Sequence, residues 1–143
     1  MFKAMKLLTA VVIASAAMGA LAAPGDPVKV VYHMNEDVAR APQTIRNIRN
    51  HMTADPKAKI VVVSHAAGIN FLLKDAKDPN GNPFEVAVQD LSMKGVEFRV
   101  CEFTLQARNL QKSALIDDVK YVPSGVAEVS RLQFQEGYAY LKP

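Results

Sequence analysis

Short runs of β-branched residues alternate with segments of helical periodicity along most of this chain. Three apolar runs, residues 28–32, 60–63 and 96–100, have the length and composition of buried strands. Between them, apolar residues recur at helical spacing over residues 41–52 and 84–91. Strands that alternate with helices in this way are typical of a parallel sheet covered by helices. The pattern therefore predicts an α/β fold.

The elements predicted for the rest of the chain are shorter. In chain order they are a helix over residues 69–76, a loop over 77–83, a helix over 103–107, a turn over 111–116, a strand over 119–122, a helix that begins near 125 and an edge strand over 138–141. The whole set predicts a three-layer sandwich: a mainly parallel sheet of about five strands, with helices on both faces. A length of 143 residues fits one such domain.

The first 22 residues have the pattern of a secretory signal peptide. Lys3 and Lys6 precede an apolar stretch over residues 7–18, and small residues follow at 20–22. We predict cleavage within one or two residues of position 22, which leaves a single domain over residues 23–143. The alternative is an uncleaved anchor, but residues 7–23 are shorter than the roughly 20 apolar residues of a spanning helix. The prediction is a periplasmic or secreted protein with no stable membrane insertion after cleavage.

Composition excludes several classes of function. Without Lys3 and Lys6 the 17 Lys and Arg residues fall by two, against 14 Asp and Glu, so the mature chain is nearly neutral. No basic stripe remains to bind a nucleic acid. The sequence has no Gly-rich phosphate loop and no serine in a nucleophile elbow, so it favours neither a nucleotide-binding protein nor a serine hydrolase. A single cysteine cannot form an internal disulfide.

Three chemically reactive side chains follow predicted strands. His33, His65 and Cys101 come at or just after the ends of the first, second and third strands. Because the carboxyl ends of parallel strands share one edge of a sheet, these side chains could face one crevice. Cys101 also precedes a predicted helix, whose free N–H groups would favour a thiolate, although the neighbouring Glu102 opposes this.

Each of these residues has a simpler interpretation. Cys101 could be a small buried hydrophobic residue, and the two histidines could be bonded to backbone groups. All three could also bind a metal ion as a His/His/Cys set, although their spacing is not that of a local metal motif. Ser124 and Gly125, which open the last helix, could bind a small anion through backbone amides or could simply form a turn.

Several segments of the chain resemble a known family. Residues 95–101, Gly-Val-Glu-Phe-Arg-Val-Cys, followed by Thr104 and Leu105, are similar to the cysteine segment of DsrE/DsrF-like proteins. Residues 122–128 and 136–140 resemble the closing segment of that family, and residues 30–33 and 61–65 resemble its first two strands. The resemblance covers nearly all of residues 23–143. It implies a compact α/β fold with a mainly parallel sheet, assembled as a homo-trimer or homo-hexamer.

The resemblance also implies a function. Sulfur-relay members of the family carry sulfane sulfur as a persulfide on a cysteine, and Cys101 matches that position. We therefore predict a carrier of sulfane sulfur rather than a turnover enzyme, with Cys101 as the reactive group, His33, His65 and Thr104 in support, and no cofactor. Its partner would be a small sulfane-sulfur compound or a protein that donates or accepts sulfur. The alternatives are a homo-oligomeric module that binds a metal or small ligand at His33, His65 and Cys101, and a structural protein with an inert Cys101.

Overall fold

Valine and isoleucine dominate the inner strands, where branched side chains pack well on both faces of a pleated sheet. The computed structural model describes residues 25–143, and five strands within them form one parallel sheet in the order β4-β3-β2-β1-β5. The strands are β1 (Lys29–Met34), β2 (Lys59–Ser64), β3 (Glu97–Cys101), β4 (Val119–Val122) and β5 (Ala139–Leu141). The predicted α/β architecture is confirmed. The predicted signal peptide lies outside the described residues.

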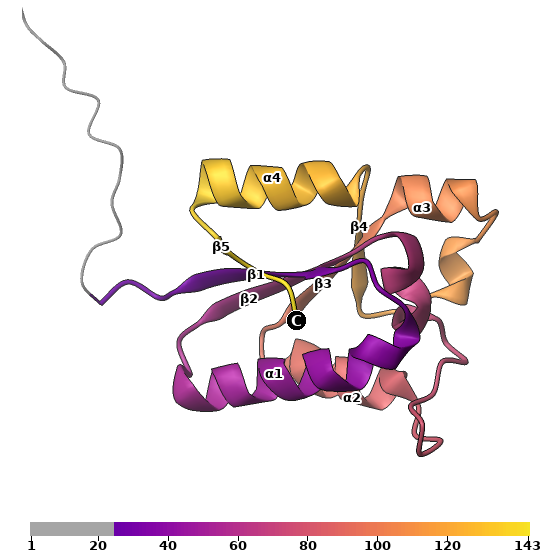
Figure 1. The fold of residues 1–143 in the computed structure, drawn as a ribbon, viewed down its shortest axis with the longest axis horizontal. Helices are drawn as coiled ribbons and strands as arrows, with labels where there is room; N and C mark the ends of the chain where they lie inside the picture. The colour runs from indigo at the N-terminus through magenta and orange to yellow at the C-terminus, as the bar shows by residue number, and fades with distance from the viewer. Residues whose placement is uncertain (1–24) are drawn as a thin grey trace, which may run out of the picture.

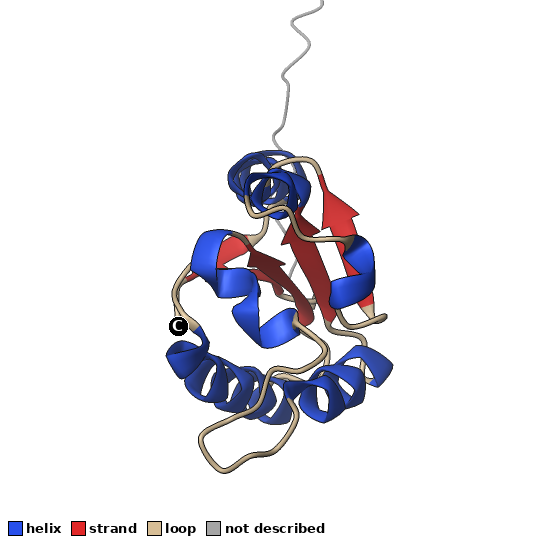
Figure 2. Ribbon diagram, turned by 90° about the vertical axis from the view of Figure 1, so that its right-hand side faces the viewer, coloured by secondary structure: helices blue, strands red, loops and turns tan. Residues whose placement is uncertain are grey.

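Helices cover both faces of this sheet (Figures 1 and 2). They are α1 (Ala41–Ala54), α2 (Phe84–Met93), α3 (Glu102–Ala107) and α4 (Gly125–Glu136), with short 3-10 helices η1 (Val38–Arg40), η2 (Ala66–Leu72) and η3 (Lys112–Ala114). In Figure 1, α1 and α2 lie below the sheet and α4 lies above it. None of the helices in residues 25–143 has the length and hydropathy needed to cross a membrane.

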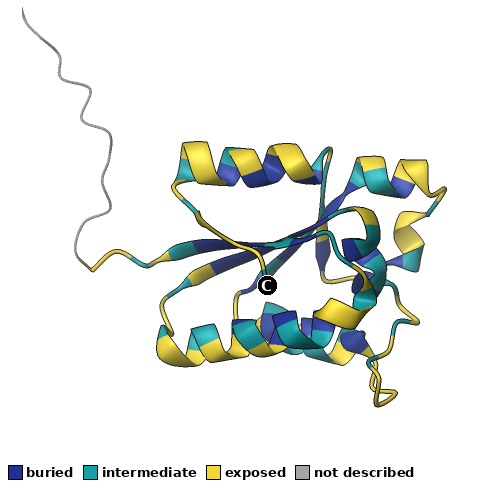
Figure 3. Cartoon of the chain, viewed as in Figure 1, coloured by how far each residue is buried: buried dark blue, intermediate teal, exposed yellow. Residues whose placement is uncertain are grey.

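Buried residues lie on the strands and on parts of the helices (Figure 3), and they form a larger and a smaller apolar core on the two faces of the sheet. The larger core joins the α1 and α2 side of the strands to η2, and its fully buried side chains include Ile48, Phe71 and Phe98. The smaller core lies under α4, where Val129 and Leu132 pack on valines of β1 and β2. Because strand side chains alternate, His33 and Cys101 are on the α4 side, next to the smaller core.

One predicted helix is wrong. The sequence predicts a helix over residues 69–76, but the structure has the 3-10 helix η2, which begins earlier and ends at Leu72. Beyond it the chain is extended and pairs antiparallel with the segment after η3: Ile116 N–H donates to the Leu72 carbonyl at 2.9 Å, and Lys74 N–H donates to the Ala114 carbonyl at 3.0 Å. These long-range hydrogen bonds outweigh the local helical spacing of the apolar residues.

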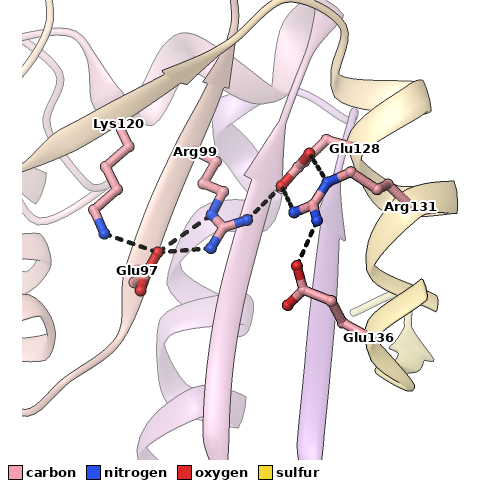
Figure 4. A network of polar contacts seen from close by, with 6 residues as sticks. All are labelled: Glu97, Arg99, Lys120, Glu128, Arg131 and Glu136. Carbon is pink, nitrogen blue, oxygen red and sulfur yellow. Dashed lines mark hydrogen bonds and ion pairs between the residues drawn. The ribbon is translucent and has the colours of Figure 1, made fainter. Parts of the chain in front are cut away.

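A network of charged side chains fixes α4 to the sheet (Figure 4). Its six members are Glu97, Arg99, Lys120, Glu128, Arg131 and Glu136. Glu128, in the first turns of α4, is 8% exposed and accepts hydrogen bonds from Arg131 at 2.8 and 2.9 Å, and also from Arg99 of β3. Hydrogen bonds from Arg131 have the largest effect on the pKa of Glu128 and lower it, whereas burial raises it. Together with the hydrogen bond from Arg99, they hold this pKa below its usual value. The network thus holds the start of α4 beside the end of β3.

Candidate functional site around Cys101

The strand order brings the candidate residues to adjacent strands. Cys101 is the last residue of β3, His65 directly follows β2, and His33 is the penultimate residue of β1. These strands are neighbours in the order β3-β2-β1, and all three end at the same edge of the sheet. On its other side β3 pairs with β4, where Cys101 is opposite Val122. The turn that begins α4 therefore also lies beside Cys101.

The Cys101 thiol is 5% exposed, and polar groups surround its sulfur. As a neutral thiol it donates to the Pro123 carbonyl, with Sγ and O 3.9 Å apart. Burial raises the pKa of the Cys101 thiol, but hydrogen bonds to its thiolate from the Thr104 hydroxyl and from the N–H groups of Gly125, Thr104 and Phe103 together lower that pKa below its usual value. The site thus favours the reactive, anionic form of the sulfur at lower pH than an ordinary thiol.

These N–H groups come from the starts of two helices. Phe103 and Thr104 are in the first turn of α3, for which Cys101 itself is the N-cap residue. Gly125 is the first residue of α4, where the Ser124 side chain accepts the Ala127 N–H at 3.3 Å. The Phe103 N–H also donates to the Pro123 carbonyl at 3.2 Å. N–H groups at a helix start and the positive end of the helix dipole both stabilise a nearby anion. The amide of Gly125, proposed from the sequence for binding a separate anion, here faces the sulfur of Cys101.

Thr104 connects Cys101 to the loop after β2. Its hydroxyl oxygen accepts the N–H of Ala66 at 3.0 Å. That contact leaves the hydroxyl proton to be donated to the Cys101 sulfur, which is the hydrogen bond that lowers the thiol pKa. Ala66 has a φ of 51°, in the left-handed region that costs energy for a residue with a Cβ. The loop between His65 and η2 is therefore held in a strained conformation next to the thiol.

His33 and His65 form a direct side-chain pair. Their Nε2 atoms are 2.6 Å apart, and Nδ1 of His33 is 2.8 Å from the Tyr140 hydroxyl of β5. Burial lowers the pKa of both imidazoles, and the positive charge of Lys142 lowers both further. For His33 the neighbouring His65 adds to this effect. Both rings therefore favour the neutral form more strongly than an ordinary histidine does.

Gly125 lies next to both His65 of the histidine pair and Cys101. A Cβ atom at this position would lie 3.0 Å from Cβ of His65 and 3.3 Å from Cβ of Cys101. Only a residue without a side chain lets α4 begin so close to both. The missing side chain keeps the Gly125 N–H within reach of the sulfur.

The Cys101 thiol does not line either of two hollows on the described surface. Their volumes are about 750 Å³ and about 580 Å³. The first is lined by residues of α3 and η3 such as Leu105 and Lys112, and the second by residues 73–76 with Leu110. Within residues 25–143, no three His, Cys, Asp or Glu side chains are grouped so that they could hold a metal ion.

Comparisons with known proteins agree with this architecture. A family model described as "DsrE/DsrF-like family" matches residues 11–143. The chain belongs to the DsrE/DsrF-like family. A search of curated proteins finds no match.

Two solved structures share the DsrE/DsrF-like fold of this chain. A protein of unknown function, MTH1491 from Methanobacterium thermoautotrophicum, is 33% identical, with a TM-score of 0.72 over 81% of this chain and 99% of that one. The ychN protein from E. coli is 13% identical, with a TM-score of 0.63 over 82% of this chain and 99% of its own. The second similarity concerns the fold alone.

The structure adds two residues to the site of this DsrE/DsrF-like chain. Tyr140 is bonded to His33, but in the sequence it is only an aromatic residue of a short edge strand. Ala66 positions Thr104, but no local pattern distinguishes it from other alanines. For Gly125, the sequence did contain a signal, because the Pro-Ser-Gly turn at residues 123–125 marks the start of a helix. Its contact with Cys101 depends on the pairing of β3 with β4, which sequence periodicity does not specify.

Replacing Thr104 by valine tests the hydroxyl that bonds to the sulfur. The valine has nearly the same shape but no proton to donate, so the pKa of Cys101 rises and less thiolate is present at pH 7. We expect alkylation by iodoacetamide at pH 7 to slow about tenfold, which corresponds to about one pKa unit, and the pH–rate profile to move to higher pH. Thr104→Ser, which keeps the hydroxyl, is the control. A valine variant with the wild-type profile would show that this hydroxyl does not act on the thiolate.

Proposed function

We propose that this protein carries sulfane sulfur as a persulfide on Cys101. The observation that supports this most directly is the set of hydrogen-bond donors around the sulfur: the Thr104 hydroxyl and the N–H groups at the starts of α3 and α4, which lower the thiol pKa. A thiolate is the form of cysteine that attacks sulfur. A persulfide at this position is also an anion, so the same donors would stabilise the loaded state.

The proposed loading step can be written with thiosulfate as the sulfur donor. The Cys101 thiolate attacks the outer sulfur of thiosulfate, a new S–S bond forms, and the bond between the two sulfur atoms of thiosulfate breaks. Sulfite leaves with the bonding electron pair, and Cys101 holds an anionic persulfide, so total charge and electron count are unchanged. In the unloading step, the thiolate of an acceptor attacks the outer sulfur and releases the Cys101 thiolate.

Intact mass spectrometry of the purified protein tests this proposal. After incubation with thiosulfate or polysulfide, we expect a gain of the mass of one sulfur atom, which dithiothreitol removes. Cys101→Ser keeps the size of the side chain and should gain nothing. No adduct on the wild-type protein, or an equal adduct on Cys101→Ser, would contradict the proposal. Alkylation of Cys101 only after unfolding would likewise identify an inert, buried thiol.

We further propose that the carrier is exported and assembles as a homo-oligomer. The predicted signal peptide over residues 1–22 supports export to the periplasm or the exterior. Apolar side chains exposed on α3 and α4 support self-association: Phe103 is 59% exposed, Val126 60% and Phe134 93%. The molecular mass of the native protein in solution tests the assembly, and a monomer at micromolar concentration would contradict it.

A further inference from the structure

Three side chains from three separate parts of the chain form a continuous line of hydrogen bonds. The Tyr140 hydroxyl on β5 is 2.8 Å from Nδ1 of His33 on β1. Nε2 of His33 is in turn 2.6 Å from Nε2 of His65, after β2. Tyr140 is 41% exposed at the edge of the sheet, whereas His65 packs against Gly125 beside Cys101. The line therefore runs from solvent towards the thiol.

The hydrogen bond between the two histidines couples their protonation states. Two imidazole nitrogens at this distance need one N–H and one lone pair between them. If His33 donates from Nε2, its Nδ1 accepts from Tyr140, and His65 carries its own proton on Nδ1. If His65 donates instead, His33 carries its proton on Nδ1 and donates it to the Tyr140 oxygen. Moving each proton along one hydrogen bond converts the first arrangement into the second and transfers one proton from end to end.

Burial and a nearby positive charge both disfavour a proton on either ring of the pair. The positive charge is that of Lys142, whose ammonium pairs with Glu36 at 3.1 Å. Burial and this positive charge lower the pKa of both rings. In addition, a proton on one ring disfavours a second proton on the other. Among residues 25–143, no hydrogen bond is recorded to Nδ1 of His65.

We propose that Tyr140, His33 and His65 form a proton relay that serves the leaving and entering thiols of sulfur transfer at Cys101. The inference rests on the proposed function and assigns its substrates to a chemical class. These are persulfides of alkyl thiols, whose leaving thiolate is basic enough to need a proton. A leaving group that is stable as an anion would not need the relay.

Each step of the proposed relay balances. The Cys101 thiolate attacks the outer sulfur of R–S–S–H, the new S–S bond forms, and the electron pair of the broken S–S bond stays on R–S⁻. This thiolate takes the proton from Nδ1 of His65, while His33 passes a proton to His65 and Tyr140 passes one to His33. The Tyr140 oxygen takes a proton from solvent, and the Cys101 persulfide, which is left as S–S–H, releases its proton to solvent and becomes an anion. When an acceptor thiol enters, it gives its proton to Nδ1 of His65, and the three transfers reverse.

Two variants test the relay through the basicity of the leaving group. Tyr140→Phe and His33→Gln interrupt the line of hydrogen bonds and leave Cys101 in place. We expect each to slow transfer from an alkyl persulfide, such as glutathione persulfide, about tenfold more than transfer from thiosulfate, whose leaving sulfite is a weaker base than an alkyl thiolate. The control is Tyr138→Phe, which removes a hydroxyl from the same C-terminal segment but not from the relay.

The outcomes separate the relay from the carrier function. Equal slowing with both sulfur donors, or none with either, would overturn the relay. If Cys101 of the wild-type protein accepts sulfur from neither donor, the carrier function fails, and a second measurement still decides the relay. In that measurement, ¹⁵N chemical shifts of the His33 and His65 rings are followed against pH. Coupled titration of the two rings, which their direct hydrogen bond requires, is expected in the wild-type protein, and independent titration there would overturn the relay.

Discussion

Replacing Gly125 by valine is expected to slow alkylation and sulfur loading of Cys101 by about 100-fold at pH 7, with the fold retained. A Cβ alone would lie 3.0 Å from Cβ of His65 and 3.3 Å from Cβ of Cys101, and the two methyl groups of valine need more room still. The start of α4 must therefore move away, which removes the Gly125 N–H from the thiolate. The pKa of Cys101 rises, and about two pKa units correspond to the expected effect.

The pH dependence of alkylation measures this effect. The rate for Gly125→Val should follow a thiol that deprotonates at higher pH, and should approach the wild-type rate once both thiols are ionised. Ala127→Val, at an exposed position in the same helical turn, introduces the same side chain away from the site. A wild-type profile in Gly125→Val, or an equal shift in Ala127→Val, would contradict a specific contact between α4 and the sulfur.

Replacing Gly68 by alanine is expected to lower the free energy of unfolding by about 3 kcal/mol, at the upper end of the usual cost of overpacking. An added Cβ would lie 2.2 Å from the Met34 carbonyl oxygen, 2.4 Å from the Met34 carbonyl carbon and 2.7 Å from the Asn35 nitrogen. All three atoms belong to the backbone at the end of β1, so no side-chain rotation relieves the overlap. Either η2 or the end of β1 must shift, and the hydrogen bond from His65 N–H to the Met34 carbonyl must lengthen.

Urea denaturation gives the comparison for Gly68→Ala. Gly81→Ala is the control, because Gly81 has a φ of +85° and no atom within 4 Å of an added Cβ. That variant has backbone strain alone, which costs about 1–2 kcal/mol. A loss of stability in Gly68→Ala no larger than in Gly81→Ala would show that η2 does not pack on β1 as closely as described.

The sequence predicted the parts of the fold that depend on local periodicity. The apolar runs that became β2 and β3, and the spacing of Ile45 and Ile48 in α1, need no partner to be recognised. The segment after Gly68 was predicted wrongly because its conformation depends on contacts with distant residues. Gly68 packs on the end of β1, and Leu72 accepts a hydrogen bond from Ile116. Such contacts leave no periodic signal.

For the candidate site, the sequence predicted individual residues but not how they lie relative to one another. The positions of His33, His65 and Cys101 at strand ends follow from the pattern of strands. Their mutual distances depend on the strand order, which periodicity does not contain. The same limit applies to Tyr140, which reaches His33 only because β5 pairs with β1 rather than with β4.

The pairing of β1 with β5 has a consequence for how the chain folds. Val30 of β1 pairs with Ala139 of β5. This contact closes a loop of the chain that contains β2, β3, β4 and all of the described helices. Loop closure over so long a separation is slow and becomes favourable only after nearer contacts exist. The central strands β1, β2 and β3 can assemble first through successive crossovers, and the last strand then docks on a sheet already formed. Until β5 docks, His33 therefore lacks its hydrogen bond to the Tyr140 hydroxyl.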